Sequence, residues 1–216
     1  MRRAILLMFV LIATYGLSGC SYNDLTAKQQ SVKGKWADIE AQLQRRADLI
    51  PNLVKAAQMA GVQEQEVFGQ IAEARSRLLN ATNAAPAAEK TAEQREAVIN
   101  AANSFGGTLG RLLVLQEQYP DLKSNQNFLK LQDSLEGTEN RIGVARTDYN
   151  KVATDYNTSI KQFPAVVTAS LFGFDEEPLF QAAPGAEQAP DIGNPNDLRR
   201  NSSQQQTSPA NTTTNN

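Results

Sequence analysis

The sequence contains no histidine among its 216 residues and only one cysteine. Histidine is the commonest metal ligand in proteins and a frequent general base, so its absence removes many hydrolytic and metal-dependent enzyme classes. It also excludes the Glu-x-x-His iron sites of ferritin-like helical bundles. We therefore expect a protein that is not an enzyme and that holds no metal or other cofactor.

Aromatic residues and net charge are scarce as well. The chain has 21 basic and 23 acidic residues, and this balance gives no electrostatic reason to bind nucleic acid. Aromatic residues make up 6% of the chain, while alanine, leucine, glutamine and glutamate are frequent, which favours helices over sheets. A single cysteine cannot form a disulfide within the chain, so stability must come from packing.

The position of the one cysteine indicates how the chain is anchored. Arg2 and Arg3 precede an uncharged run, "AILLMFVLIATY" at residues 4–15, and the sequence "LSGC" ends at Cys20. The run has the length of a signal-peptide core and falls short of the roughly 20 residues of a membrane-spanning helix. Because "LSGC" has the layout of a bacterial lipobox, we predict a signal peptide at residues 1–19 and lipidation at Cys20. The alternative is an unmodified cysteine in an uncleaved helix.

Lipidation would join the cysteine thiol to diacylglycerol and add an acyl chain such as palmitate to the new amino end. Two or more acyl chains hold a protein stably at a membrane, whereas one does so only marginally. Ser21 follows the cysteine, a pattern of outer-membrane lipoproteins rather than of those retained in the inner membrane. We expect a lipid anchor in the bacterial cell envelope, with the outer membrane facing the periplasm favoured.

Apolar residues recur at helical spacing in four segments, which predicts an all-α fold: an antiparallel bundle of four long helices. The first segment starts at Leu25 and is kinked at Pro51, because proline lacks the amide donor of a helix interior. The second covers residues 62–80. The third opens with a capping box at residues 91–94, and the fourth runs over residues 128–163.

The bundle domain is predicted to span residues 20–181. Beyond it, residues 182–216 carry several prolines and end in "NSSQQQTSPANTTTNN". A segment of this composition cannot bury enough apolar surface to offset the entropy of ordering. We predict a disordered C-terminal tail.

A charged residue interrupts the first apolar stripe. Arg46 lies three residues after Leu43 and four before Ile50, so it must pair with an acid or reach water. Two functions are open for the polar residues near it: a network that fixes the register of the helices, which we favour, or a site that recognises a partner. The candidate residues are Arg46, Asn52, Glu117, Glu139, Asn140, Arg146 and Asn150, with Glu117 and Glu139 as possible acidic partners of Arg46.

Several sequence words resemble the LemA family, and they occur in order over roughly residues 22–181. They are "YNDL" at 22–25, "QLQRRADLIPNLV" at 42–54, "EQYPDLKSNQNFLKLQDSLEGTENRI" at 117–142, "ARTDYN" at 145–150, "YN" at 156–157, "FP" at 163–164 and "LF" at 179–180. The resemblance implies a helical bundle attached to an envelope membrane by its amino end, with a role beside membrane proteases or in envelope stress.

The chain departs from that family in two respects. Many relatives have a histidine where this chain reads "QMAGVQE" at residues 58–64, so any role of that histidine does not hold here. Many relatives are also anchored by an uncleaved helix, whereas this chain has the lipobox. The functional hypothesis is a lipid-anchored bundle that contacts an unidentified envelope protein. An envelope enzyme, or a ligand-binding lipoprotein using buried carboxylates, is the alternative.

Overall fold

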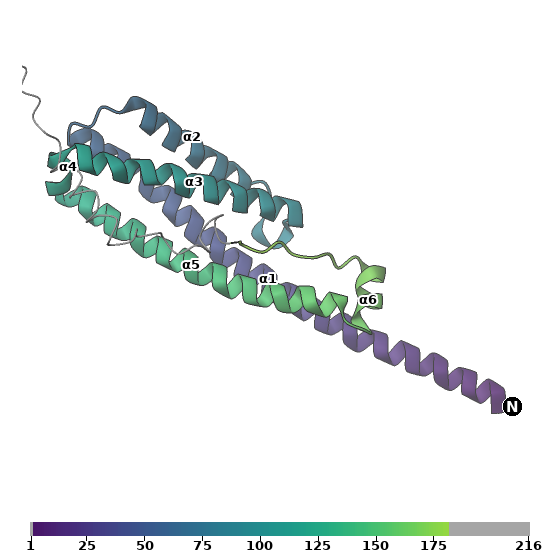
Figure 1. Cartoon of the computed structure of the whole chain (residues 1–216). Coiled ribbons are helices and arrows are strands. Elements are labelled where there is room, and N and C mark those ends of the chain that lie inside the picture. Colours follow the sequence, from purple (N-terminus) through teal and green to yellow (C-terminus); the bar gives the residue numbers. More distant parts are fainter. Residues whose placement is uncertain (1, 182–216) are drawn as a thin grey trace, which may run out of the picture. The chain divides into compact units, whose positions relative to one another are not determined.

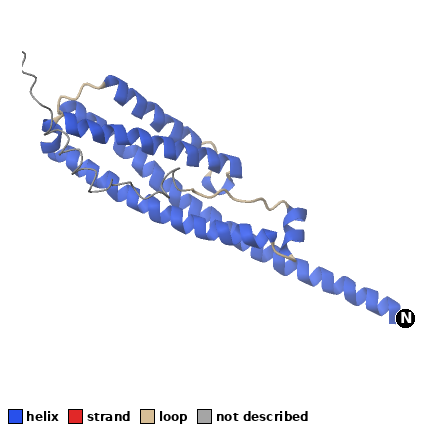
Figure 2. Ribbon diagram, viewed as in Figure 1, coloured by secondary structure: helices blue, strands red, loops and turns tan. Residues whose placement is uncertain are grey.

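The computed structural model describes the backbone of residues 2–181 and the side chains of residues 21–181, except those of residues 113 and 123. Over residues 2–181 the regular elements are all helices (Figures 1 and 2). The prediction of an all-α fold is therefore confirmed. The tail predicted for residues 182–216 lies outside the described residues.

The helices follow one another with short connections. They are α1 (Arg2–Met59), α2 (Gln65–Thr82), the 3-10 helix η1 (Ala87–Glu89), α3 (Ala92–Gln118), α4 (Pro120–Ser124), α5 (Gln126–Lys161) and α6 (Ala165–Phe172). The main packing partners are α1 with α5 and α2 with α3, as Figure 1 shows. Helix α1 is longer than predicted, and it continues through Pro51, so the kink there stays a prediction. Within the described residues, no helix has the length and apolar character needed to cross a membrane.

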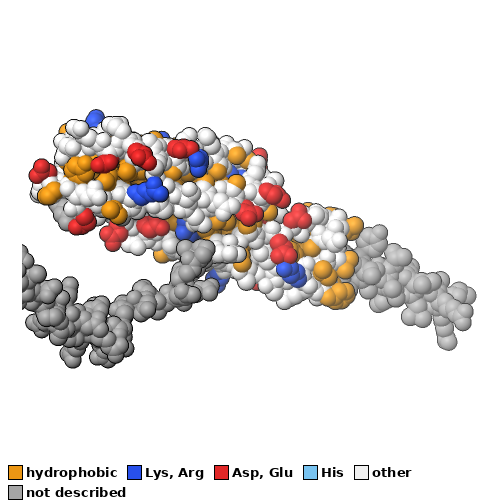
Figure 3. Space-filling model, turned by 45° about the horizontal axis from the view of Figure 1, so that its top comes forward, with side chains coloured by type: hydrophobic (Ala, Val, Ile, Leu, Met, Phe, Trp, Pro, Cys, Tyr) orange, Lys and Arg blue, Asp and Glu red, His pale blue; other side chains and the backbone are white. Residues whose placement is uncertain are grey.

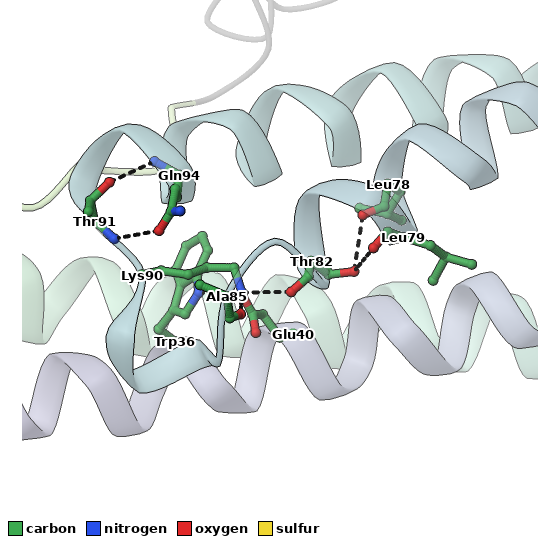
Figure 4. Close-up of polar contacts among 9 residues, drawn as sticks. All are labelled: Trp36, Glu40, Leu78, Leu79, Thr82, Ala85, Lys90, Thr91 and Gln94. Carbon is green, nitrogen blue, oxygen red and sulfur yellow. Dashed lines mark hydrogen bonds and ion pairs between the residues drawn. The ribbon is translucent and has the colours of Figure 1, made fainter.

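Local side chains set where the helices begin. The Thr91 hydroxyl accepts a hydrogen bond from the Gln94 amide at 3.3 Å, and the Gln94 side chain accepts one from the Thr91 amide at 3.0 Å (Figure 4). The predicted capping box is confirmed. At the start of α5, the Asn125 side chain accepts hydrogen bonds from the amides of Asn127 and Phe128, which satisfies donors that have no partner within the helix.

The apolar stripe predicted for the first helix lies in the core. Seven of its members are buried, Leu25, Val32, Trp36, Ile39, Leu43, Ile50 and Leu53, and the last, Val54, is partly buried. Stripes from α3 and α5 contribute to the same core cluster, and each large side chain buried there contributes about 1.5–3 kcal/mol. The predicted stripe of the fourth helix is wrong at its end, because Phe163 is exposed.

Beyond α5 the chain forms a further short helix, which was not among the four helices predicted. Helix α6 ends at Phe172 and is capped by Gly173, whose φ of 71° lies in the left-handed region that glycine adopts without steric cost. Residues 174–180 then have no regular secondary structure and lie against α5 through the contacts described below. We call residues 174–180 the C-terminal strap.

Candidate functional site

Two asparagines of α5 hold the C-terminal strap by its backbone. The Asn150 amide group donates to the Phe180 carbonyl at 2.8 Å, and its oxygen accepts from the Phe180 amide at 2.9 Å. Asn157 binds the carbonyl and the amide of Glu177 in the same way, at 2.8 and 2.9 Å. Each side-chain amide therefore pairs with both backbone groups of one strap residue.

The spacing of the two asparagines matches the spacing of the two strap residues. Asn150 and Asn157 are two helical turns apart on one face, about 10.5 Å at 1.5 Å per residue. Glu177 and Phe180 are three residues apart, about 10 Å in an extended chain. The asparagines therefore bind the strap as a neighbouring strand would, and this face of α5 recognises extended backbone.

The Phe180 side chain fixes the strap in the core. Its ring stacks on Trp36 with the centroids 5.9 Å apart and meets Tyr149 edge-on at 5.8 Å. The guanidinium of Arg146 lies 4.9 Å from the centroid of the same ring, a favourable cation–π geometry. The Tyr149 hydroxyl donates to the Pro178 carbonyl at 2.8 Å. Burial, followed by the charge of Glu177, raises the pKa of Tyr149.

The strap also places a carboxylate in the interior. Glu177 forms an ion pair with Arg95 of α3, whose side chain is 1% exposed. The Arg95 guanidinium lies 5.6 Å from the Trp36 ring centroid. Burial and the nearby Glu177 charge also raise the pKa of Tyr156 to about 12. Because leaving either member of a buried pair alone is costly, the Arg95–Glu177 pair ties the strap to α3.

The charge on the first apolar stripe has an acidic partner. Arg46 Nη1 lies 2.8 Å from Glu139 Oε2, with the arginine side chain 8% exposed and the glutamate 46% exposed. The guanidinium lies 5.5 Å from the Phe105 ring centroid, and a Cβ built on Gly106 would be 3.5 Å from Arg46 Nη2. Burial lowers the pKa of Arg46, Glu139 opposes that effect, and Arg146 lowers the pKa further.

Of the seven polar residues singled out from the sequence, the structure brings four together. Arg46, Glu139 and Arg146 lie together, and Arg146 reaches the strap through Phe180, which Asn150 also binds. The other three, Asn52, Asn140 and Glu117, are exposed. The backbone of Cys20 belongs to α1, and its side chain lies outside the described residues.

Two buried ion pairs were not predicted from the sequence: Arg95–Glu177, and one between Lys90 and Glu40. Lys90 Nζ lies 3.1 Å from Glu40, donates to the Thr82 carbonyl at 2.6 Å and also donates to the Ala85 carbonyl (Figure 4). Glu40 in turn accepts from Trp36 Nε1 at 2.6 Å. A cation near the end of α2 satisfies carbonyl groups that have no partner within the helix.

The arrangement is suited to binding and holding a chain segment. Two carboxylates lie largely buried in the described part of the chain, those of Glu40 and Glu177. Each forms an ion pair with a cation. Among the described residues, no group of three or more histidine, cysteine, aspartate or glutamate side chains could hold a metal ion. The polar chemistry of the site thus consists of paired charges and amide groups directed at a backbone.

Comparison with known proteins gives one family and several distant relatives. The model of the LemA family matches residues 35–193. The magnetosome protein MamQ 2 of Paramagnetospirillum magneticum is 29% identical over 181 residues, which cover 77% of this chain and 66% of that protein. The magnetosome protein MamQ of Magnetospirillum gryphiswaldense is 28% identical with the same coverage. Protein LemA of Metamycoplasma hominis is 25% identical over 161 residues, 74% of this chain and 69% of its own. The match thus spans just under two thirds of the length of the MamQ relatives.

Proposed function

The chain belongs to the LemA family, and from this premise we propose that it is a lipoprotein of the bacterial cell envelope that acts through contacts with another protein. In this proposal the signal peptide at residues 1–19 is removed and Cys20 carries the lipid. The four long helices form one antiparallel bundle outside the cytoplasm, held at the outer membrane and facing the periplasm. The lipobox layout of "LSGC" supports the anchor.

The asparagine-held strap is the observation that carries the proposal of a contact function. Asn150 and Asn157 bind the strap with their amide groups, in the register of an extended backbone, on one face of α5. This is recognition chemistry of the kind that proteins use when one extended segment is held by backbone hydrogen bonds and one anchoring side chain. The ion pairing of Glu40 and Glu177 favours a structural role for these carboxylates over acid–base catalysis.

The partner in this proposal is another envelope protein, in the setting of envelope stress or of membrane proteolysis. The resemblance of the sequence words to the LemA family supports that setting. The contact surface would include exposed apolar side chains on different helices, such as Val114 on α3 and Val144 on α5.

Site-specific photocrosslinking in intact cells tests this function. A photoreactive residue at position 114 or 144 should give a discrete crosslinked species containing one envelope protein. The same species should disappear in the Cys20→Ala variant, because that chain no longer reaches its membrane. If exposed positions all along α3 and α5 give no crosslink while the protein is present at the membrane, the contact function is wrong.

A further inference from the structure

Exposed apolar side chains gather at one end of the described part of the molecule. Four of the most prominent are Phe163, Val167, Leu171 and Phe172, with 84%, 61%, 77% and 56% of their surfaces exposed. Val166 of α6 and Tyr22 of α1 are also exposed. Figure 3 shows apolar side chains concentrated at the end that α6 occupies in Figure 1. Contiguous exposed apolar surface of this kind marks a site of contact with something apolar.

The patch has a defined geometry on α6. Thr168 and Ala169 face the interior, whereas Val167 and Leu171 are one helical turn apart and exposed. Phe163 lies in the turn just before α6 and is also exposed. The stripe therefore points away from the core, and nothing in the described part of the chain covers it.

The patch lies next to the end of the chain that carries the proposed anchor. The Tyr22 ring meets Phe172 edge-on with the centroids 4.9 Å apart, and it meets Phe174 at 5.7 Å. Tyr22 is two residues after Cys20, so the lipid would be attached two residues away from a side chain that contacts α6. A membrane that holds the acyl chains would then lie beside the exposed stripe.

The charges around the patch indicate which kind of lipid surface it could contact. Helix α6 itself, "AVVTASLF", has no charged residue. At its border Lys161 is paired with Glu176 at 2.8 Å, and Asp175 adds a further acid. This gives no excess of positive charge to attract acidic headgroups, so attraction would come from the apolar side chains.

We propose that α6 and Phe163 dock onto the lipid surface beside the anchor, with Phe163, Val167 and Leu171 inserted among the headgroups of an electroneutral bilayer. This inference rests on the proposed membrane anchor. Docking orients the bundle at a fixed tilt instead of leaving it free on a flexible tether. It also adds a second apolar contact with the lipid beside the acyl chains of the anchor.

The test uses the mature lipoprotein purified from bacterial membranes. Lipid occupies the Cys20 thiol, so the Leu171→Cys variant offers one free thiol for an environment-sensitive fluorophore. Val144→Cys is the matched control, because Val144 is 64% exposed on α5. Each labelled protein is reconstituted into phosphatidylcholine vesicles with ordinary or brominated acyl chains, and association with the vesicles is measured by flotation.

Docking predicts that brominated lipid quenches the label at position 171 roughly two-fold, because a docked apolar face lies about 5–10 Å into the headgroup and acyl boundary. The fluorescence of the label at position 144 should be unaffected. Neither result should change in about 0.5 M salt, which screens surface charges strongly. If the protein floats with the vesicles and position 171 is not quenched, or if both positions are quenched alike, docking by α6 is wrong and the anchor stands. If the protein does not float and Cys20 has a free thiol, both the docking and the proposed anchor are wrong.

Discussion

Replacing Asn150 with alanine should loosen the C-terminal strap while the long helices stay folded. The side chain makes two hydrogen bonds to the backbone of Phe180, at 2.8 and 2.9 Å. Each contributes about 0.5–1.5 kcal/mol net, so their loss should lower the free energy of unfolding by about 1–3 kcal/mol. If the strap detaches, the burial of Phe180 is lost as well, about 1.5–3 kcal/mol, partly offset by the freedom that the strap regains.

Chemical denaturation of the whole protein measures this loss, and hydrogen exchange of the Phe180 amide reports on the strap itself. Asn140→Ala is the matched control, because Asn140 is an exposed asparagine on the same helix. Alanine is the better helix former by up to about 0.7 kcal/mol, and the control measures that gain. If the free energies of unfolding of the two variants agree within about 0.5 kcal/mol and the Phe180 amide keeps its protection in Asn150→Ala, then Asn150 does not hold the strap.

Three further predictions follow from the ion pairs, the tyrosines and the strap. Arg46→Met should lower the free energy of unfolding by about 1–2 kcal/mol, less than for a fully buried pair because Glu139 is half exposed. Adding Glu139→Gln should recover part of this loss. A double-mutant cycle that shows no coupling between the two residues would contradict the pairing. Folding raises the pKa of Tyr156 from 10.0 to about 12. The contribution of this residue to stability is therefore fully present below pH 10 and is lost as the pH rises toward 12. This tyrosine should contribute a slope of at most about 1.4 kcal/mol per pH unit to the free energy of unfolding. If a Tyr156→Phe variant loses stability with pH as steeply as the wild type, this residue does not cause the alkaline loss. Ending the chain after Gln181 should leave helix content and Tm nearly unchanged, whereas ending it after Gly173 removes Phe180 and Glu177 and should lower Tm by several degrees. Circular dichroism during heating measures both effects. A large drop in Tm for the form that ends at Gln181 would show that the tail packs against the bundle.

The long helices could be predicted because their signals are local. An apolar residue every three or four positions identified the buried face of α1, and the four residues from Thr91 to Gln94 were enough to place the start of α3. Arg46 was found because a charge on an apolar stripe requires a partner. The same rule applied to Arg95, three residues before Val98 on the stripe of α3, would have found a second buried cation.

The strap could not be predicted in this way. Its contacts join residues 30 positions apart, Asn150 and Phe180, and they use side-chain amides that leave no periodic pattern. The repeated "YN" at residues 149–150 and 156–157 was visible in the sequence, but its meaning depends on an extended segment lying alongside. Helix α6 was missed because Pro164 and Gly173 enclose a short segment that is apolar on nearly every side, so no helical period appears.

The mass of the amino-terminal peptide, measured on protein extracted from bacterial membranes, tests the lipid anchor most directly. We expect the chain to begin at Cys20, and this residue to carry a thioether-linked diacylglycerol and an amide-linked acyl chain. A chain that retains residues 1–19 and has a free thiol at Cys20 would contradict the lipid anchor, and with it the placement of α6 at a lipid surface.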